Sequence, residues 1–343
     1  MIQDQFSRRS LFLSALSQLA LRGQDTTFSA DVKVINVLAT VRNKQGQIIK
    51  DLKKEDFSLE EDGRPQTIKY FSRETELPLT LGLLVDTSGS QRQVLGQERS
   101  ASARFIDQVI REAKDMAFVI HFDFETELLQ DLTSSRKKLR ESIQDIQPPQ
   151  LQRRQPQGSG GGQGRRGGGG TVLYDAVMLA SDELMRNQGG RKALILLTDG
   201  VDTGSKVGIN EAIESAQRTD TLIYSILFFD EQAYGGQRPG PMMGGRRRGG
   251  YPQPMPPPGM NHPDGKKILQ KMSRETGGGF FEVTKKLPIE EVFDRIQEEL
   301  RSQYSIGYSS DKPNGGAGFR SIRLNTSQKN LIVQTRDKYY SAR

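Results

Sequence analysis

The order of apolar segments after Pro78 constrains the fold of this chain most strongly. Apolar runs of strand length alternate there with amphipathic runs of helix length, an order typical of β-α-β units and a mostly parallel sheet. A short edge strand at 127–132 follows its predecessor so closely that we expect the pair to be antiparallel. The fold class is therefore α/β, with a doubly wound, mostly parallel sheet. The other strands are expected at 80–85, 116–122, 193–197, 222–229 and 279–283, and the helices at 97–111, 136–146, 172–185, 209–217, 266–275 and 289–303.

Segments of β character flank this α/β region on both sides. They combine β-branched and aromatic residues with turn sequences such as Glu61-Asp62-Gly63. Strands are expected at 31–40, 57–59, 68–71, 304–308, 321–324 and 331–334. We therefore predict that residues 30–77 and 310–343 form one β-rich, sandwich-like unit, and that an α/β domain over 78–309 is inserted between them.

Two low-complexity inserts interrupt the α/β region. Residues 148–170 are rich in Gln, Pro, Arg and Gly, and residues 233–259 in Gly, Pro, Met and Arg, so neither has enough apolar surface to form a packed core. Much of the positive charge behind the formal net charge of +7 lies in them. The charge therefore gives the folded core no preference for nucleic acid, and binding of an anionic polymer through the Arg/Gly inserts is an alternative function. The arginines concerned are Arg153, Arg154, Arg165, Arg166, Arg238 and 246–248.

The N-terminus resembles a twin-arginine export signal. Arg8 and Arg9 directly precede the apolar run 11–21. This run is shorter than the about 20 residues that a membrane-spanning helix needs. We expect residues 1–25 to direct export to the periplasm or the cell exterior. The alternatives are an uncleaved N-terminal anchor and an amphipathic helix.

Hydroxyl and carboxylate side chains directly follow the first strand of the α/β region. Asp86, Ser88 and Ser90 alternate there, at the carboxyl edge of the sheet, where open α/β folds bind ligands. Their oxygens would point to one side of the backbone, an arrangement that suits a hard divalent cation. Asp and Ser after a strand also make turns and cap helices, so this motif alone leaves a purely structural role open.

Two later loops carry the same kinds of side chain. Thr171 precedes the helix expected at 172–185, and Asp199 follows the strand expected at 193–197. Each one alone is more typical of a helix cap or a turn. In this chain order, however, Asp86-x-Ser88-x-Ser90, Thr171 and Thr198-Asp199-Gly200 resemble the three loops of the metal-ion-dependent adhesion site in von Willebrand factor type A domains, which have a Rossmann-like fold.

The resemblance implies a site and a function. In that family the serines and the threonine coordinate the metal directly or through water, and the aspartates act directly or as hydrogen-bond acceptors. By resemblance, the metal is Mg²⁺, or Mn²⁺ or Ca²⁺, and it is held by Asp86, Ser88, Ser90, Thr171 and Asp199. A coordination position left open would take a carboxylate from a partner. The function expected is metal-dependent protein binding or adhesion, and the partner is a protein that offers an acidic residue.

A narrower resemblance covers most of the chain. Glu61-Asp62-Gly63, Phe71-Ser72-Arg73-Glu74 and the closing 301–308 resemble the VWFA-related proteins of Acidobacteria, which are exported and of unassigned role. The inserts depart from the generic domain, and the first directly precedes Thr171. Asp202 is a further candidate, as a neighbour that holds a metal-bound water. An association with the cell envelope is expected, and the sequence identifies neither the partner nor the oligomeric state.

Enzymatic functions fit these residues poorly. A phosphoryl-transfer site with Asp86 as nucleophile would need an acid two residues later, and this position is Ser88. His121 lies in an expected strand and His262 borders an insert, so neither suits a serine hydrolase. The chain has no cysteine, which excludes a thiolate nucleophile. We therefore expect no enzyme and no catalytic residue, and the alternative to adhesion is a scaffold component of an envelope complex that works without metal.

Overall fold

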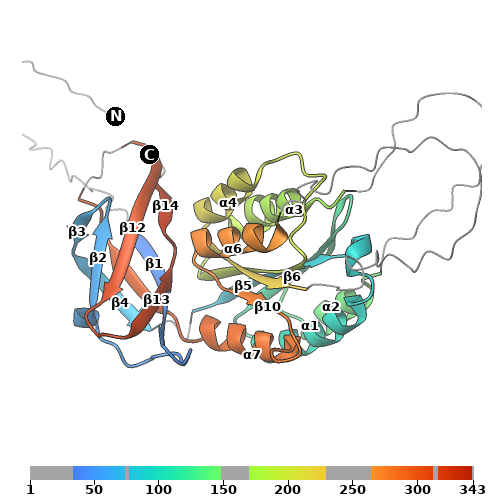
Figure 1. Ribbon diagram of the computed structural model, residues 1–343, viewed down its shortest axis with the longest axis horizontal. Coiled ribbons are helices and arrows are strands. Elements are labelled where there is room, and N and C mark those ends of the chain that lie inside the picture. The colour runs from blue at the N-terminus through green and yellow to red at the C-terminus, as the bar shows by residue number, and fades with distance from the viewer. Residues whose placement is uncertain (1–33, 74–76, 148–169, 229–263, 312–315, 342–343) are drawn as a thin grey trace, which may run out of the picture. The chain divides into compact units, whose positions relative to one another are not determined.

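The computed structural model describes residues 34–73, 77–147, 170–228, 264–311 and 316–341 (Figure 1). The expected export signal lies outside the described residues, as do the two inserts except for Gly170. The described residues belong to one compact unit. None of their helices is long and apolar enough to cross a membrane.

A six-stranded sheet with the order β10-β9-β8-β5-β6-β7 forms the centre of the α/β region. All neighbouring strands are parallel except β6 and β7, which are antiparallel. The predicted doubly wound sheet with one reversed edge strand is therefore confirmed. The strands are β5 (Leu79–Asp86), β6 (Met116–Phe122), β7 (Thr126–Thr133), β8 (Arg191–Thr198), β9 (Thr221–Leu227) and β10 (Phe280–Glu282).

Helices cover both faces of this sheet (Figure 1). One face carries α1 (Leu95–Val109), α2 (Arg136–Gln144) and α7 (Ile289–Leu300), and the other carries α3 (Leu173–Leu179), α4 (Ile209–Arg218) and α6 (Gly265–Thr276). A π-helix, Ala180–Met185, continues α3, and 3-10 turns occur at Lys54–Asp56 and Gly89–Gln91. The last helix is shorter than predicted, because the chain has to turn before Tyr304 starts a strand.

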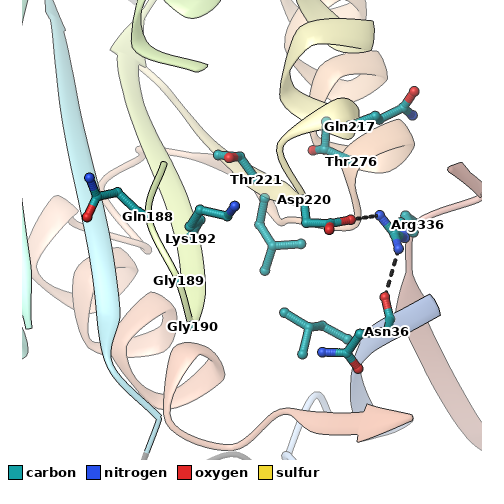
Figure 2. Close-up of a pocket in the computed structure, with 12 residues that line it drawn as sticks. Asn36, Gln188, Gly189, Gly190, Lys192, Gln217, Asp220, Thr221, Thr276 and Arg336 are labelled. Atoms are coloured by element: carbon teal, nitrogen blue, oxygen red, sulfur yellow. Dashed lines mark hydrogen bonds and ion pairs between the residues drawn. The ribbon is translucent and has the colours of Figure 1, made fainter. Parts of the chain in front are cut away.

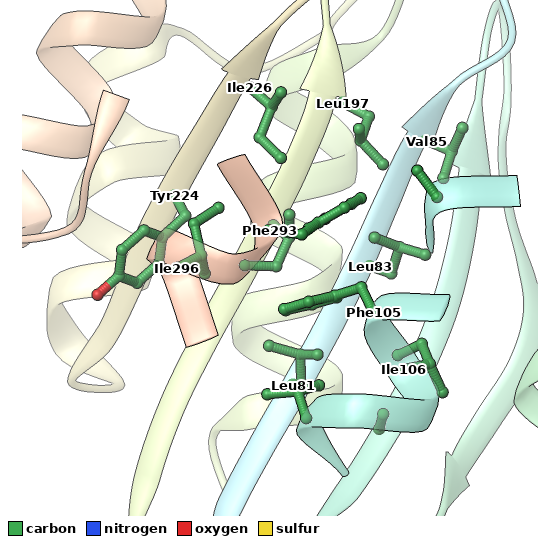
Figure 3. Packing of buried hydrophobic residues seen from close by; sticks show 14 of the residues in the cluster. Leu81, Leu83, Val85, Phe105, Ile106, Leu197, Tyr224, Ile226, Phe293 and Ile296 are labelled. Atoms are coloured by element: carbon green, nitrogen blue, oxygen red, sulfur yellow. The ribbon is translucent and has the colours of Figure 1, made fainter. Parts of the chain in front are cut away.

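Burial on both faces explains why β5 is almost continuously apolar. Every residue of β5 is buried, as expected for a central parallel strand. On one face Phe105 of α1 stacks on Phe293 of α7, with ring centroids 4.4 Å apart (Figure 3). On the other face Gly82 leaves room for Phe118, since a Cβ at Gly82 would lie 2.4 Å from the Phe118 ring.

Two four-stranded sheets, with the orders β13-β1-β11-β4 and β14-β12-β2-β3, form the flanking unit. They share one apolar core, so the unit is a sandwich built from N- and C-terminal segments, as predicted. Strands β3 and β14 were not expected from the sequence. The strands are β1 (Ile35–Asn43), β2 (Phe57–Glu61), β3 (Arg64–Gln66), β4 (Ile68–Arg73), β11 (Tyr304–Tyr308), β12 (Gly318–Thr326), β13 (Leu331–Thr335) and β14 (Lys338–Ser341).

Strand β11 connects the C-terminal part of the sandwich to the N-terminal part. It pairs antiparallel with β1 on one side and with β4 on the other. Strand pairing therefore groups residues 304–308 with the sandwich, whereas the sequence suggested 310 as its first C-terminal residue. We propose that the C-terminal part of the sandwich begins at Tyr304.

Candidate metal site

Asp86 is the last residue of β5, and two short hydrogen bonds hold its buried carboxylate. Oδ1 accepts a hydrogen bond from the Ser88 backbone N–H at 2.8 Å, and Oδ2 accepts one from the Thr198 hydroxyl at 2.6 Å. The second contact follows from strand register, because Val85 pairs with Leu197 and the next residues on both strands lie side by side. The sheet thus fixes the orientation of Asp86.

The first loop brings two serine hydroxyls together. Ser88 and Ser90 lie on either side of Gly89, where the chain enters the 3-10 turn Gly89–Gln91. Their Oγ atoms are 3.1 Å apart and are within hydrogen-bonding distance of each other. Asp86, Ser88 and Ser90 therefore form one cluster, as the motif predicts.

The second loop carries Thr171, and backbone contacts place this residue at the same edge of the sheet. The N–H of Val172 donates to the carbonyl of Asp123 at 2.9 Å. Asp123 directly follows Phe122, the residue of β6 that pairs with Asp86. The Thr171 carbonyl accepts hydrogen bonds from the N–H groups of Thr203 and Gly204, so the second loop is also tied to the third.

The third loop follows β8 and carries Asp199. Its Oδ1 accepts a hydrogen bond from the Val201 N–H at 3.0 Å, an Asx-type turn. Gly200 needs to be glycine, because its φ is +78° and a Cβ would lie 2.4 Å from the Gly265 carbonyl oxygen. This close approach to α6 fixes the path of the chain after Asp199.

Asp202 supports the second loop. Its Oδ2 accepts hydrogen bonds from the Tyr174 N–H at 3.1 Å and from the Ser205 hydroxyl at 2.5 Å. The Ser205 hydroxyl also lies within hydrogen-bonding distance of the Tyr174 and Asp175 N–H groups. Asp202 thereby holds the start of α3 and the loop before it, and its expected role as a holder of metal-bound water stays a prediction.

Two buried acids, Asp86 in this cluster and Glu98 of α1, have raised pKa values. Burial raises the pKa of Asp86 to about 7, with a contribution from the charge of Asp199, although the hydrogen bonds from Ser88 and Thr198 oppose the shift. Burial also raises the pKa of Glu98 well above its usual value, and the charges of Asp86 and Asp199 add to this effect. A bound cation would lower both pKa values, because it would offset the repulsion between the carboxylates and stabilise their ionised forms in the buried site.

Glu98 was not expected from the sequence to lie near the site. This residue of α1 is completely buried, and neither carboxylate oxygen has a hydrogen-bond partner among the described residues. Glu98 lies on the apolar face of α1 with Leu95, Ala101 and Phe105, at helical spacing. An acid on the buried face of a helix that starts next to the Asp86 motif is the signal that could have identified it.

The donor set fits a hard divalent cation. The set expected from the sequence combines the carboxylates of Asp86 and Asp199 with the hydroxyls of Ser88, Ser90 and Thr171, without imidazole or thiolate. Hydrogen bonds bring Asp86, Ser88 and Ser90 together, and Thr171 and Asp199 lie on the two neighbouring loops. Among the described residues no group of three His, Cys, Asp or Glu side chains is placed to hold a metal ion. A metal at this place would therefore depend on hydroxyl groups and water as much as on carboxylates.

The family comparison agrees with this geometry. Residues 81–201 match the family model of the von Willebrand factor type A domain. The chain contains a von Willebrand factor type A domain. The matched range starts in β5 and ends just after Asp199, so it includes all five residues that the sequence placed at the metal.

The chain is similar to several solved structures at low sequence identity. They include BatB from Bacteroides thetaiotaomicron, at 15% identity and a TM-score of 0.42, covering 65% of this chain and 100% of that one. Another is the von Willebrand factor domain of the type V pili tip protein Mfa5 from Porphyromonas gingivalis, at 12% identity and a TM-score of 0.43, covering 65% and 95%. A third is proximal thread matrix protein 1 from the mussel byssus with a zinc-occupied MIDAS motif, at 14% identity and a TM-score of 0.45, covering 71% and 50%. No curated protein matches the sequence.

Proposed function

We propose that this chain is an exported binding protein whose A domain holds a divalent cation at Asp86, Ser88, Ser90, Thr171 and Asp199, and binds a carboxylate of a protein partner through it. One observation carries the proposal. The Asp86 carboxylate is fixed by Ser88 N–H and Thr198 Oγ1 beside two hydroxyls that lie 3.1 Å apart. A turn or a helix cap alone would not require an acid with no solvent exposure at this position.

The chemistry of the donor set supports an anionic ligand. A cation held by hydroxyls and few carboxylates keeps much of its positive charge, and so attracts a further carboxylate. The bound cation would act as a Lewis acid for that carboxylate. The protein supplies the rest: Thr198 orients Asp86, and Asp202 and Ser205 hold the loop that carries Thr171.

We propose Mg²⁺ as the resident metal, with Mn²⁺ and Ca²⁺ as alternatives. Oxygen donors alone favour these hard cations over copper or nickel. Zinc also accepts oxygen ligands, but its usual protein sites include nitrogen or sulfur donors, which this cluster lacks. No catalytic role is assigned to the site.

Export by the twin-arginine-like segment around Arg8 and Arg9, and a place in the cell envelope, are part of the same proposal. Two alternative functions have their own sequence features. A scaffold without metal would use the sandwich and the A domain only as a rigid frame. Binding of an anionic envelope polymer would use the arginines of residues 148–170 and 233–259.

Calorimetric titration with Mg²⁺ and Mn²⁺ tests the proposal. We expect saturable binding to the full chain, and a loss of about tenfold or more in affinity on Ser88→Ala, because a coordinating or water-holding hydroxyl is removed. The matched control is Ser100→Ala on the exposed side of α1, where the Ser100 hydroxyl donates to the Gly96 carbonyl of the same helix. Absence of binding to the unaltered protein would favour the scaffold without metal.

A further inference from the structure

A polar cavity lies at the opposite edge of the central sheet from Asp86. It is formed where β8 and β9 begin, whereas Asp86 lies at the carboxyl end of the parallel strands. Its volume is ≈ 240 Å³, several times the about 30 Å³ that one water occupies in the liquid. Figure 2 shows the residues that line it. Residues of the α/β region and of the sandwich line it, including Lys192, Asp220, Asn36 and Arg336.

Lys192 is the unusual side chain of this cavity. The residue is 8% exposed, and its ammonium makes no hydrogen bond or ion pair with any described residue. Figure 2 shows the side chain directed into the cavity. Burial lowers the pKa of Lys192, although the charge of Asp220 opposes this effect. Because most of the side chain is buried, the ammonium has lost part of its hydration, and an anion in the cavity would replace it.

The nearby acid is already engaged. Arg336 Nη1 donates to Asp220 Oδ1 at 2.5 Å, and Arg336 Nη2 donates to the Asn36 carbonyl at 2.7 Å. Among the lining residues, Lys192 and Arg336 are cationic and Asp220 is the single anion, so the cavity has one positive charge in excess. That excess charge belongs to Lys192, since Arg336 and Asp220 form an ion pair with each other.

A second hydrogen-bond donor faces the same space. The side-chain oxygen of Asn36 accepts a hydrogen bond from the Ser305 hydroxyl at 2.7 Å, which fixes the amide so that its nitrogen is the free end. Figure 2 shows this nitrogen on the cavity side. The cavity thus combines one unpaired cation with a fixed neutral donor, the arrangement expected around a bound oxyanion.

We propose that this cavity binds a small oxyanion, a carboxylate or a phosphate, with Lys192 as its counter-ion and Asn36 as a second donor. The site is separate from the metal-dependent one and does not rest on it. Because its lining comes from both the α/β region and the sandwich, an anion bound there would bridge Lys192 of β8 and Asn36 of β1.

The test is thermal unfolding of the full chain at pH 7 in inorganic phosphate, in acetate and in chloride at matched ionic strength. We expect phosphate or acetate to raise Tm relative to chloride, and this rise to disappear in Lys192→Met and to persist in Lys192→Arg. Lys69→Met, which removes an exposed lysine of β4, is the charge-matched control and should keep the rise.

Calorimetry with the same two anions separates the two ligand classes. Stronger binding of phosphate would assign the site to phosphorylated ligands, and stronger binding of acetate would assign it to carboxylates. In either case the affinity should fall at least tenfold in Lys192→Met. The proposal is overturned if neither anion binds the unaltered protein, or if Lys192→Met binds as well as the unaltered protein does.

Discussion

Replacement of Thr198 by valine tests how the protein prepares the metal site. Thr198 is fully buried, and its hydroxyl donates to Asp86 Oδ2 at 2.6 Å while accepting the Gly200 N–H at 3.0 Å. Valine has nearly the same shape, so the substitution removes both hydrogen bonds without opening a cavity. The Thr198 side chain is not among the expected metal ligands, and any effect on metal binding has to pass through Asp86 or through the loop at Gly200.

The expected magnitude follows from two independent estimates. A hydrogen bond to a charged group contributes about 1.5–3 kcal/mol. Loss of a partner that orients a metal ligand typically lowers metal affinity by about 10–100-fold, which corresponds to about 1.4–2.8 kcal/mol. The two ranges agree, so we predict that Thr198→Val weakens Mg²⁺ and Mn²⁺ binding by about 10–100-fold.

The assay is calorimetric titration of the variant, the unaltered protein and a matched control. Thr219→Val serves as the control because the Thr219 hydroxyl is also buried, but it bonds the carbonyls of Ser215 and Ala216 at the end of α4. Unchanged metal affinity in Thr198→Val would refute the argument that this hydroxyl orients Asp86. An equal loss in Thr219→Val would attribute the effect to general destabilisation.

Three further predictions concern stability. Asp115 is buried, yet the hydrogen bonds that it accepts from Arg111 lower its pKa, so its contribution to stability is present above its unfolded pKa of about 3.9 and is lost as the pH falls below that value. The substitution Asp115→Asn should therefore lower the free energy of unfolding by about 2–4 kcal/mol in urea at pH 7. A change below about 0.5 kcal/mol would contradict this prediction. The substitution Gly82→Ala should lower the free energy of unfolding by about 1–3 kcal/mol in the same assay, because the added methyl would lie 2.4 Å from Phe118 Cζ. An unchanged midpoint would show that the neighbouring side chains rearrange to make room for the methyl group. Glu98 has a raised pKa, so its contribution to stability is greatest below its unfolded pKa of about 4.3 and is lost as the pH rises. In the presence of EDTA, Tm should therefore fall more between pH 5 and pH 8 in the unaltered protein than in Glu98→Gln. Parallel Tm profiles for the two proteins would argue against a buried acid at this position.

The sequence was sufficient for the central sheet, because the physical signals there are local. The run 79–86 is apolar along its whole length, which is typical of a strand buried on both faces, and β5 is buried at every residue. The position of Asp86 at the carboxyl end of that strand follows from the same run. Edge strand β7 could be predicted as antiparallel from the short connection alone.

Features that depend on distant parts of the chain could not be predicted in this way. Glu98 shares a helix face with apolar residues, and only the tertiary fold brings it near Asp86 and Asp199. The pairing of β11 with β1 and β4 joins segments that are far apart in the sequence, and it is the basis for our proposal that the C-terminal part of the sandwich begins at Tyr304. The ion pair between Asp220 and Arg336 also depends on long-range packing. The same holds for the position of the Lys192 ammonium, which has no ion-pair partner within the part of the chain that the structure describes.

The most direct test of the metal site is anomalous diffraction from crystals of the full chain soaked in Mn²⁺. We predict one strong anomalous peak among the hydroxyls of Ser88, Ser90 and Thr171 and the carboxylates of Asp86 and Asp199. The same crystals soaked without Mn²⁺ should lack the peak. A fully soaked crystal with no peak between these three loops, or with its peak elsewhere, would rule out the proposed metal site.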